Sequence, residues 1–324
     1  MPRLPRLAAA VAAGAAFTVL AMGTAVSAGD PTVSDPRVVA HFAFAAGQTP
    51  ENIALEPDGS ADLTFAYAHQ VARVDRNGAT RILATLPAVT NPQTPNIGAA
   101  IATGIARAHD GTLYVAYATG TAETGIWRVS PGGEPEQIAQ LPADGLPNGI
   151  ALDEKCDRIF VADSVRGVVW SVPLATGVPA VWASGAALEP TAELPFGANG
   201  LKVHDGAVWV SNTGRGTLLR IPIGPGREGA AGPVETRATG LAIDDFAFTG
   251  HGDTVLAALI LEDALELVRP DGSHRTVLTA ADGLTNPTSV AVHAKNVYVP
   301  SAAYFAPSNP DPNLLLARIS KNKD

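Results

Sequence analysis

The chain has 324 residues, of which 31 are acidic and 22 are Lys or Arg, so its formal net charge is −9 at pH 7. An acidic chain without a basic run argues against binding to nucleic acid or to anionic membrane surfaces. Cys156 is the single cysteine, which excludes an intramolecular disulfide and leaves the burial of apolar side chains to stabilise the fold.

The first residues have the layout of a secretory signal peptide. Arg3 and Arg6 precede a run of small and apolar residues, and Val26-Ser27-Ala28 resembles a cleavage site. We expect cleavage after about Ala28, a secreted protein, and no membrane association of the mature chain. The loss of two arginines and no acid would change the charge from −9 to −11. A retained membrane anchor is the alternative, although the run is short and rich in Ala and Gly.

A polar segment and a single strand precede the first repeat. Residues 29–36 contain two prolines and are expected to form a flexible lead-in. Residues 37–44 alternate between apolar and polar like a strand. We expect this strand to become the outer strand of the last repeat, because residues 313–320 end the sixth repeat one strand short. Such pairing would close a ring and remove exposed strand edges.

A repeat of about 45 to 50 residues fills the rest of the chain. Each copy begins with a polar residue, here called the anchor, and continues with two short apolar runs separated by a turn of the Asp-Gly kind. The six anchors are Glu51, Thr103, Asn148, Asn199, Asp244 and Thr288. Six such repeats without an amphipathic helical period predict an all-β fold, namely a single six-bladed β-propeller domain over residues 37–324.

The anchors are expected to meet at one end of the central channel, because the first strand of every blade lines it. They offer two carboxylates, two amides and two hydroxyls, and no His or Cys. Such oxygen ligands suit Ca²⁺ best, with Mg²⁺, Mn²⁺ or Zn²⁺ as further options. Alternatively, Asn and Asp could merely satisfy backbone groups where a strand begins. In that case two facing carboxylates would repel each other without a cation.

The repeat and the anchors resemble the calcium-dependent six-bladed propeller superfamily of gluconolactonase, senescence marker protein, diisopropylfluorophosphatase and paraoxonase. The resemblance covers residues 37–320, and the Gly-Ala-Asn-Gly-Leu run at 197–201 is similar to a family motif. It implies that a metal is held by Glu51 from the first blade, Asn148 and Asn199 from the third and fourth, and Asp244 from the fifth.

The chain departs from the gluconolactonase pattern at two anchors. Glu51 is followed by Asn-Ile where that branch has Gly-Pro, and Asp244 is followed by Asp245 where that branch has Gly. The second feature resembles paraoxonase, in which the residue after the Asp also serves the metal. Asp245 is therefore either a fifth ligand or a residue that only begins a strand.

The resemblance implies a metal-dependent hydrolase that acts on small-molecule lactones or esters, and with the signal-peptide pattern we expect a secreted monomer. Asp244, or a water that it activates, would attack the carbonyl carbon. His69 follows a second strand, in a loop expected near the channel mouth, and is either a general base or a loop histidine without a role. The loops 87–98 and 183–197 are long and Pro-rich, which suits a substrate-covering rim or an exposed connection.

Two other functions fit the same sequence. One is a non-catalytic extracellular propeller that binds a partner or glycan, which an apolar or aromatic mouth without a cation would indicate. The other is a strictosidine-synthase-like condensing or cyclising enzyme, in which Glu51 or another acid would work without metal.

Overall fold

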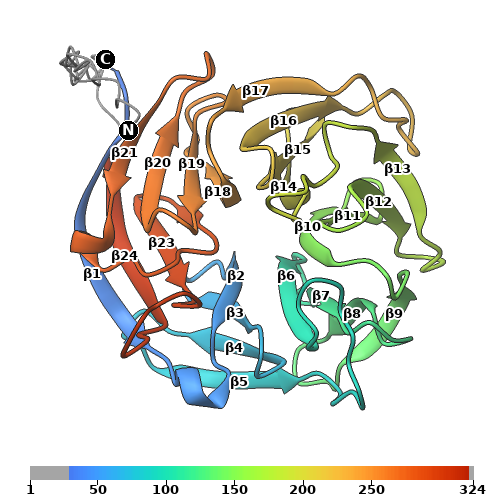
Figure 1. Cartoon of the computed structure of the whole chain (residues 1–324), viewed down its shortest axis with the longest axis horizontal. Helices are drawn as coiled ribbons and strands as arrows, with labels where there is room; N and C mark the ends of the chain where they lie inside the picture. The colour runs from blue at the N-terminus through green and yellow to red at the C-terminus, as the bar shows by residue number, and fades with distance from the viewer. Residues whose placement is uncertain (1–28, 321–324) are drawn as a thin grey trace, which may run out of the picture.

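A computed structural model of the chain describes residues 29–320, so the signal peptide expected over residues 1–28 lies outside the described residues. The described strands form six antiparallel four-stranded sheets that are arranged as blades around a central channel (Figure 1). The predicted all-β, six-bladed propeller is therefore confirmed. Within residues 29–320, no helix has both the length and the apolar character needed to cross a membrane.

The blades are numbered in chain order, and their strands are given from the channel outwards. The first three blades consist of β2 (Pro50–Leu55), β3 (Ala61–Phe65), β4 (Gln70–Val74) and β5 (Thr80–Thr85); β6 (Ile101–Arg107), β7 (Leu113–Ala118), β8 (Gly125–Val129) and β9 (Glu136–Gln140); and β10 (Pro147–Asp153), β11 (Arg158–Asp163), β12 (Val168–Pro173) and β13 (Ala180–Ser184).

The last three blades consist of β14 (Ala198–His204), β15 (Ala207–Asn212), β16 (Thr217–Pro222) and β17 (Glu235–Thr239); β18 (Ile243–Phe248), β19 (Val255–Leu259), β20 (Ala264–Val268) and β21 (His274–Leu278); and β22 (Ala291–His293), β23 (Asn296–Ser301), β24 (Asn313–Ser320) and β1 (Thr32–His41). Two short 3₁₀ helices, η1 (Phe44–Ala46) and η2 (Ala280–Asp282), lie in the connections.

The ring closes through β1, which pairs antiparallel with β24 from Thr32 opposite Ser320 to His41 opposite Asn313. The predicted closure of the ring by the N-terminal strand is thus confirmed. The prediction that residues 29–36 form a flexible lead-in is wrong for most of that segment, because β1 begins at Thr32. A register shift between Ser34 and Arg37 accommodates Pro36, which has no N–H to donate to the ladder.

The second strands of the first five blades are buried on both faces, because neighbouring blades pack against each other. Every residue of β3, β7, β11, β15 and β19 is buried. Such strands read as continuous apolar runs instead of alternating ones, which explains the pattern of the repeats. In the interface between blades four and five, for example, Trp209 packs with Phe246 and Leu259.

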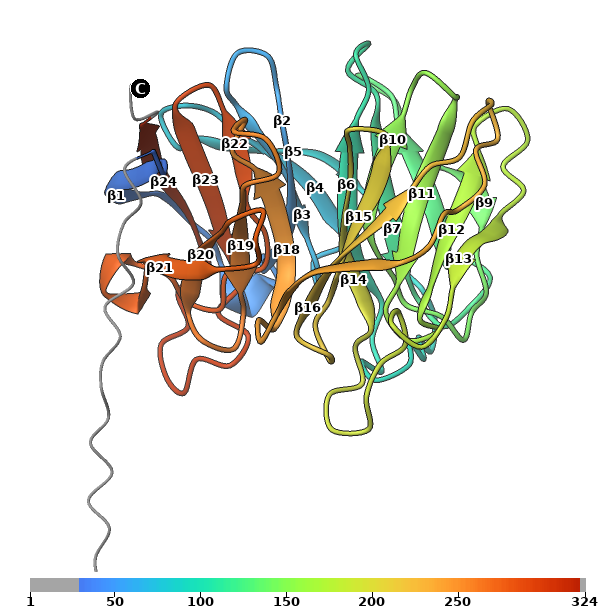
Figure 2. The ribbon, with the colours of Figure 1, turned by 90° about the horizontal axis from the view of Figure 1, so that it is seen from above.

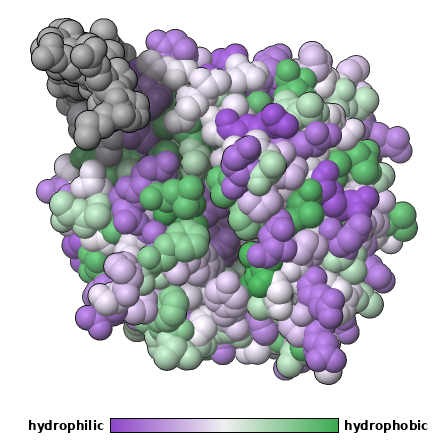
Figure 3. Space-filling model, viewed as in Figure 1, coloured by the Kyte–Doolittle hydropathy of each residue, from purple (hydrophilic) through white to green (hydrophobic). Residues whose placement is uncertain are grey.

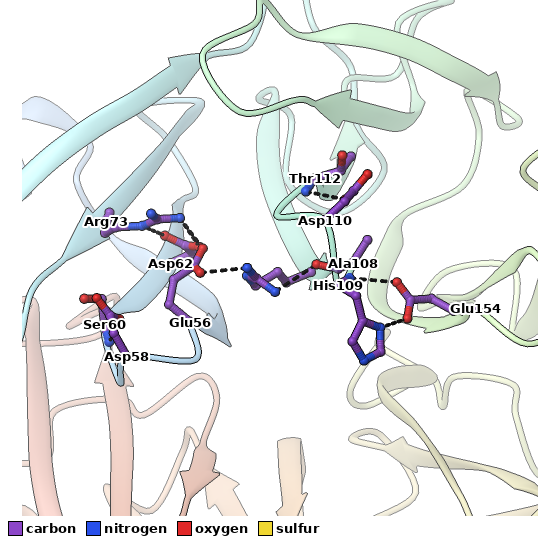
Figure 4. Close-up of polar contacts among 11 residues, drawn as sticks. Glu56, Asp58, Ser60, Asp62, Arg73, Ala108, His109, Asp110, Thr112 and Glu154 are labelled. Carbon is purple, nitrogen blue, oxygen red and sulfur yellow. Dashed lines mark hydrogen bonds and ion pairs between the residues drawn. The ribbon is translucent and has the colours of Figure 1, made fainter.

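Ion pairs join blades one and two at the end of the channel opposite the anchors (Figure 4). Arg107 of blade two lies 2.9 Å from a carboxylate oxygen of Glu56 in blade one. Arg73 also contacts Glu56, and it donates to both oxygens of Asp62 at 2.7 and 2.9 Å. Burial raises the pKa of Asp62 to about 6 despite these bonds. Both arginines pair with acidic side chains, and the pair between Arg107 and Glu56 joins two blades. We therefore assign the cluster a structural role.

Candidate metal centre

The inner strands bulge where the anchors lie. The pairing of β10 with β11 shifts register between Pro147 and Ile150, around Asn148, and that of β14 with β15 shifts between Ala198 and Leu201. Equivalent shifts occur in β2 and β18. Because a bulge bends the strand and re-aims its side chains, it can turn the anchor side chains toward the cavity that they line.

Glycines after two anchors allow neighbouring inner strands to approach closely. A Cβ at Gly149 would lie 2.4 Å from the backbone oxygen of Asn199, and one at Gly200 would lie 2.4 Å from Oδ1 of Asp245. No side chain fits at such distances, so the Asn-Gly sequence of blades three and four brings the amides of adjacent blades together.

Four of the predicted ligands line one cavity at the channel mouth. Glu51, Asn148, Asn199 and Asp244, from four different blades, all contribute to a cavity of about 540 Å³. The structure therefore brings together the residues that the repeat alignment placed on one ring.

The two threonine anchors have a different role. The hydroxyl of Thr103 donates to the backbone oxygen of Pro147 at 2.8 Å, and that of Thr288 donates to the backbone oxygen of Pro50 at 2.9 Å. Each bond joins one blade to the anchor region of the next. These hydroxyls satisfy backbone groups, as short polar side chains at strand starts commonly do.

Hydrogen bonds hold both amides by their nitrogen. Asn199 donates from Nδ2 to Oδ1 of Asp244 at 2.6 Å and to the hydroxyl of Thr213 at 2.8 Å. Asn148 donates from Nδ2 to the hydroxyl of Ser164 at 3.3 Å. An amide whose N–H groups are used keeps its carbonyl oxygen as a ligand or acceptor. Ser164 and Thr213 lie in the turns that follow β11 and β15, and the repeat pattern did not predict their role in holding the amides.

The carboxyl groups of the cavity hold their protons more strongly than usual. Burial raises the pKa of Glu51 to about 7, and the charge of Asp245 adds to this, while a hydrogen bond from Tyr304 opposes it. Burial and the charges of Glu51 and Asp245 raise the pKa of Asp244 well above its ordinary value. No Lys, Arg or His is among the lining residues described for this cavity. A divalent cation would supply the missing positive charge.

Tyr304 contributes a contact that the sequence did not reveal. It lies in the loop between β23 and β24, and its hydroxyl donates to Oε2 of Glu51 at 2.5 Å. Burial and the neighbouring Glu51 raise the pKa of Tyr304 well above its ordinary value, so the hydroxyl keeps its proton. Its ring lies edge-on to that of Tyr67, with centroids 5.9 Å apart. These contacts fix the position of Glu51.

Asp245 does not line the cavity, and its expected role as a fifth ligand is not supported by its contacts. Lys202 of β14 lies 2.7 Å from both carboxylate oxygens, and Asn52 and Ser289 donate to Oδ2 at 3.1 and 2.7 Å. Asp245 stands where blades three and four have Gly149 and Gly200. Its side chain occupies the space beside Gly200, inside the channel, where Lys202 balances its charge.

We expect Lys202→Met to destabilise the protein by about 2 kcal/mol, because it leaves the buried Asp245 carboxylate without a counter-charge. Urea unfolding followed by fluorescence measures the effect. Lys155→Met, at an exposed turn, is the matched control and should change stability by less than about 0.5 kcal/mol. Equal effects of the two substitutions would contradict a structural role for Lys202.

His69 lies outside the cavity lining, so its expected role as a general base beside the metal is not supported. Its Nε2 lies 2.9 Å from the backbone oxygen of Ala100, and its ring packs near Tyr117 with centroids 5.5 Å apart. Burial lowers the pKa of His69, which favours the neutral ring. The residue has a φ of 54° in the turn after β3, and this turn brings Tyr67 to the cavity instead.

No family model and no curated protein matches the sequence. Among solved structures, the chain is similar to regucalcin, a calcium-binding protein from Agrobacterium tumefaciens, with 16% identity, a TM-score of 0.65 and coverage of 89% of this chain and 95% of that one. It is also similar to a candidate gluconolactonase, with 15% identity, a TM-score of 0.61 and coverage of 89% and 93%.

A third similar structure is the PQQ-bound aldose sugar dehydrogenase from Streptomyces coelicolor, with 16% identity, a TM-score of 0.63 and coverage of 90% and 99%. The names of the three proteins describe different activities. Because one fold can host unrelated sites, this likeness shows the propeller fold, and the function must be argued from the cavity itself.

Proposed function

We propose that the protein is a hydrolase of lactones or esters that depends on a divalent metal ion, with Ca²⁺ as the preferred ion. One observation carries the proposal: Glu51, Asn148, Asn199 and Asp244 converge from four blades on one cavity, and both carboxyl groups have a raised pKa there. The calcium-binding regucalcin and the candidate gluconolactonase among the structural neighbours are compatible with it.

The donor set fits a hard cation. Two carboxylates balance the charge of a divalent ion, and the amide oxygens of Asn148 and Asn199 add neutral oxygen ligands. Calcium takes six to eight oxygens in a flexible arrangement, so water or substrate would complete its shell. When bound, the cation would polarise the substrate carbonyl and stabilise the negative charge that develops on its oxygen.

The side chains around the metal donors have separate proposed roles in accepting a proton and in orienting the ligands. Asn199 holds Oδ1 of Asp244, and no described residue donates to Oδ2. Asp244 is therefore the group proposed to accept a proton from the attacking water. Tyr304 keeps Glu51 oriented toward the cavity. The apolar walls limit the access of bulk water, which strengthens each of these electrostatic contacts.

We further propose that the protein acts as a secreted monomer. Secretion rests on the signal-peptide pattern of residues 1–28. The monomeric state rests on the closed ring, since β1 pairs with β24 of the same chain and no second copy is needed to complete the last blade. Mass spectrometry of protein recovered from the culture medium would test the cleavage after Ala28, and sedimentation would test the oligomeric state.

Removal of metal is expected to lower turnover of γ-butyrolactone and phenyl acetate by at least about 100-fold, because the cation supplies the charge stabilisation at the carbonyl oxygen. The measurement compares protein dialysed against EDTA with the same sample after CaCl₂ is restored. Recovery with Ca²⁺ supports the proposal, and unchanged turnover after complete metal removal contradicts it.

The exposed aromatic rim of the cavity favours a second candidate, a propeller that binds a partner without catalysis. If the protein only binds a partner, neither the EDTA-treated sample nor the sample with restored CaCl₂ should turn over the lactone or the ester. The pKa of Glu51, about 7, also suits a metal-independent acid catalyst, as in a condensing enzyme. Condensation of an amine with an aldehyde in EDTA would favour that third function.

A further inference from the structure

The cavity is apolar except at its acidic end. Eleven of the seventeen residues that line it are aliphatic or aromatic. Among the described residues that line it, Glu51 and Asp244 are the only carboxylic acids, and there is no basic side chain to bind a carboxylate or phosphate. Because the two carboxylates already balance the bound cation, no side chain of the lining is left to balance the charge of an anionic substrate.

The polar side chains of the lining have few hydrogen bonds left to offer. Asn199, Asn148 and Thr213 are bonded within the network at the acidic end. Asn96 donates its Nδ2 to the backbone oxygen of Pro195 at 2.9 Å. A polyhydroxylated substrate such as a sugar lactone would lose its hydration without enough partners in exchange, which disfavours its binding.

Two loops supply part of the apolar wall. The bond between Asn96 and Pro195 joins the loop 87–98 to the loop 185–197, and these loops contribute Ile97, Leu194 and Phe196 to the lining. The second loop, between β13 and β14, projects from the lower face of the propeller in Figure 2. Both loops were expected as a rim or as exposed connections, and their contacts favour a rim.

Four large apolar side chains remain exposed around the cavity and form what we call the collar: Phe44 (38% exposed), Tyr67 (44%), Leu261 (51%) and Phe305 (62%). Only seven such side chains are exposed across residues 29–320, so more than half of them border this one cavity. Figure 3 shows apolar groups around the hollow at the centre of the face viewed. Apolar groups concentrated in this way mark a binding surface.

We infer that the substrate is an uncharged lactone or ester with a hydrocarbon chain, whose carbonyl lies at the acidic end while the chain lies against the collar. The reaction in this inference rests on the proposed hydrolase. The chain preference rests on the lining and the collar alone.

The test uses five-membered lactones with unbranched side chains of one, four and seven carbons, and glucono-δ-lactone as a polar comparison, with calcium-loaded protein. Burial of one methylene strengthens binding by about fourfold at most. We therefore expect kcat/KM to rise by at least about 100-fold from the one-carbon to the seven-carbon side chain, and glucono-δ-lactone to be the poorest substrate. A flat series, or a preference for glucono-δ-lactone, would overturn the inference and leave the proposed hydrolase intact.

A double variant tests whether the hydrocarbon chain of the substrate lies against the collar. Leu261→Ser combined with Phe305→Ser is expected to reduce the ratio of kcat/KM between the seven-carbon and one-carbon lactones by at least about tenfold. Both side chains are exposed, so the fold should tolerate the changes. Val178→Ser removes an equally exposed apolar side chain (66%) outside the cavity lining and should leave the ratio unchanged. An unchanged ratio in the collar variant would show that the chain does not lie there.

A binding measurement separates this inference from the proposed function. Five-membered lactams with the same side chains resist hydrolysis, and calorimetry measures their affinity whether or not the protein has any lactonase activity. Affinity that rises with chain length, together with no turnover of any lactone, would refute the hydrolase and support the hydrocarbon site. Affinity independent of chain length would overturn the hydrocarbon site.

Discussion

Asp244→Asn is expected to weaken calcium binding by at least about 100-fold and to abolish lactone hydrolysis, because it removes one of two carboxylates that balance the cation. The replacement has the same shape and can still accept the bond from Asn199. Calorimetric titration with CaCl₂ measures the affinity. The same substitution removes the repulsion between Asp244 and Glu51, so the metal-free variant should unfold at a higher temperature than the metal-free parent at pH 8.

The combination of weaker metal binding with a more stable metal-free protein distinguishes a ligand from a residue that only supports the fold. A merely structural Asp244 would give a less stable variant. Asp110→Asn, at an exposed turn where Asn can still accept the bond from the backbone N–H of Thr112, is the control and should change neither property. Retention of parental calcium affinity by the Asp244 variant would remove the basis of the proposed function.

Metal-free protein is expected to lose stability as the pH rises from about 5 to about 8, and Ca²⁺ should restore it. The pKa of Glu51 is about 7 in the folded chain against an ordinary 4.5, and the pKa of Asp244 is raised as well. A raised carboxyl pKa favours the folded state fully below the ordinary value, and this advantage disappears as the pH rises through the folded value. For Glu51 alone, the loss amounts to about 3 kcal/mol at most.

Thermal unfolding at a series of pH values, with EDTA or with CaCl₂, measures this dependence. Deprotonated carboxylates bind calcium better, so the stabilisation by Ca²⁺ should grow across the same pH range. The Glu51→Gln variant is the control for the source of the effect, since it should weaken the dependence in EDTA and leave the part that arises from the burial of Asp244. A metal-free unfolding temperature that stays constant or rises between pH 5 and pH 8 would contradict the electrostatic description of the cavity.

The number and order of the blades could be predicted because each blade is a local unit with its own turns and apolar runs. The two apolar runs expected in each repeat are the first two strands of a blade, for instance β18 and β19 in the fifth. The start of β1 was missed, because Pro31 and Pro36 suggested a flexible segment. Pairing with β24 ordered it, and that partner lies almost the whole length of the chain away.

The candidate site could be predicted only at its anchors. Glu51 and Asp244 occupy the same point of the repeat, and this position predicts that they lie at one end of the channel. The repeat could not predict that Asp244 lines the cavity whereas Asp245 pairs with Lys202. Adjacent in sequence, they face different surroundings because β18 bulges between Ile243 and Phe246 and because Lys202 comes from another blade.

The sequence alone determined the architecture and the ring of polar anchors, because strand length, turn chemistry and repeat spacing are local properties that each blade carries for itself. Only the tertiary structure decided which groups face the cavity, that Tyr304 rather than His69 contacts Glu51, and that an apolar collar surrounds the mouth. The physical reason is that burial, raised pKa values and side-chain contacts arise between blades, from residues that no local pattern relates.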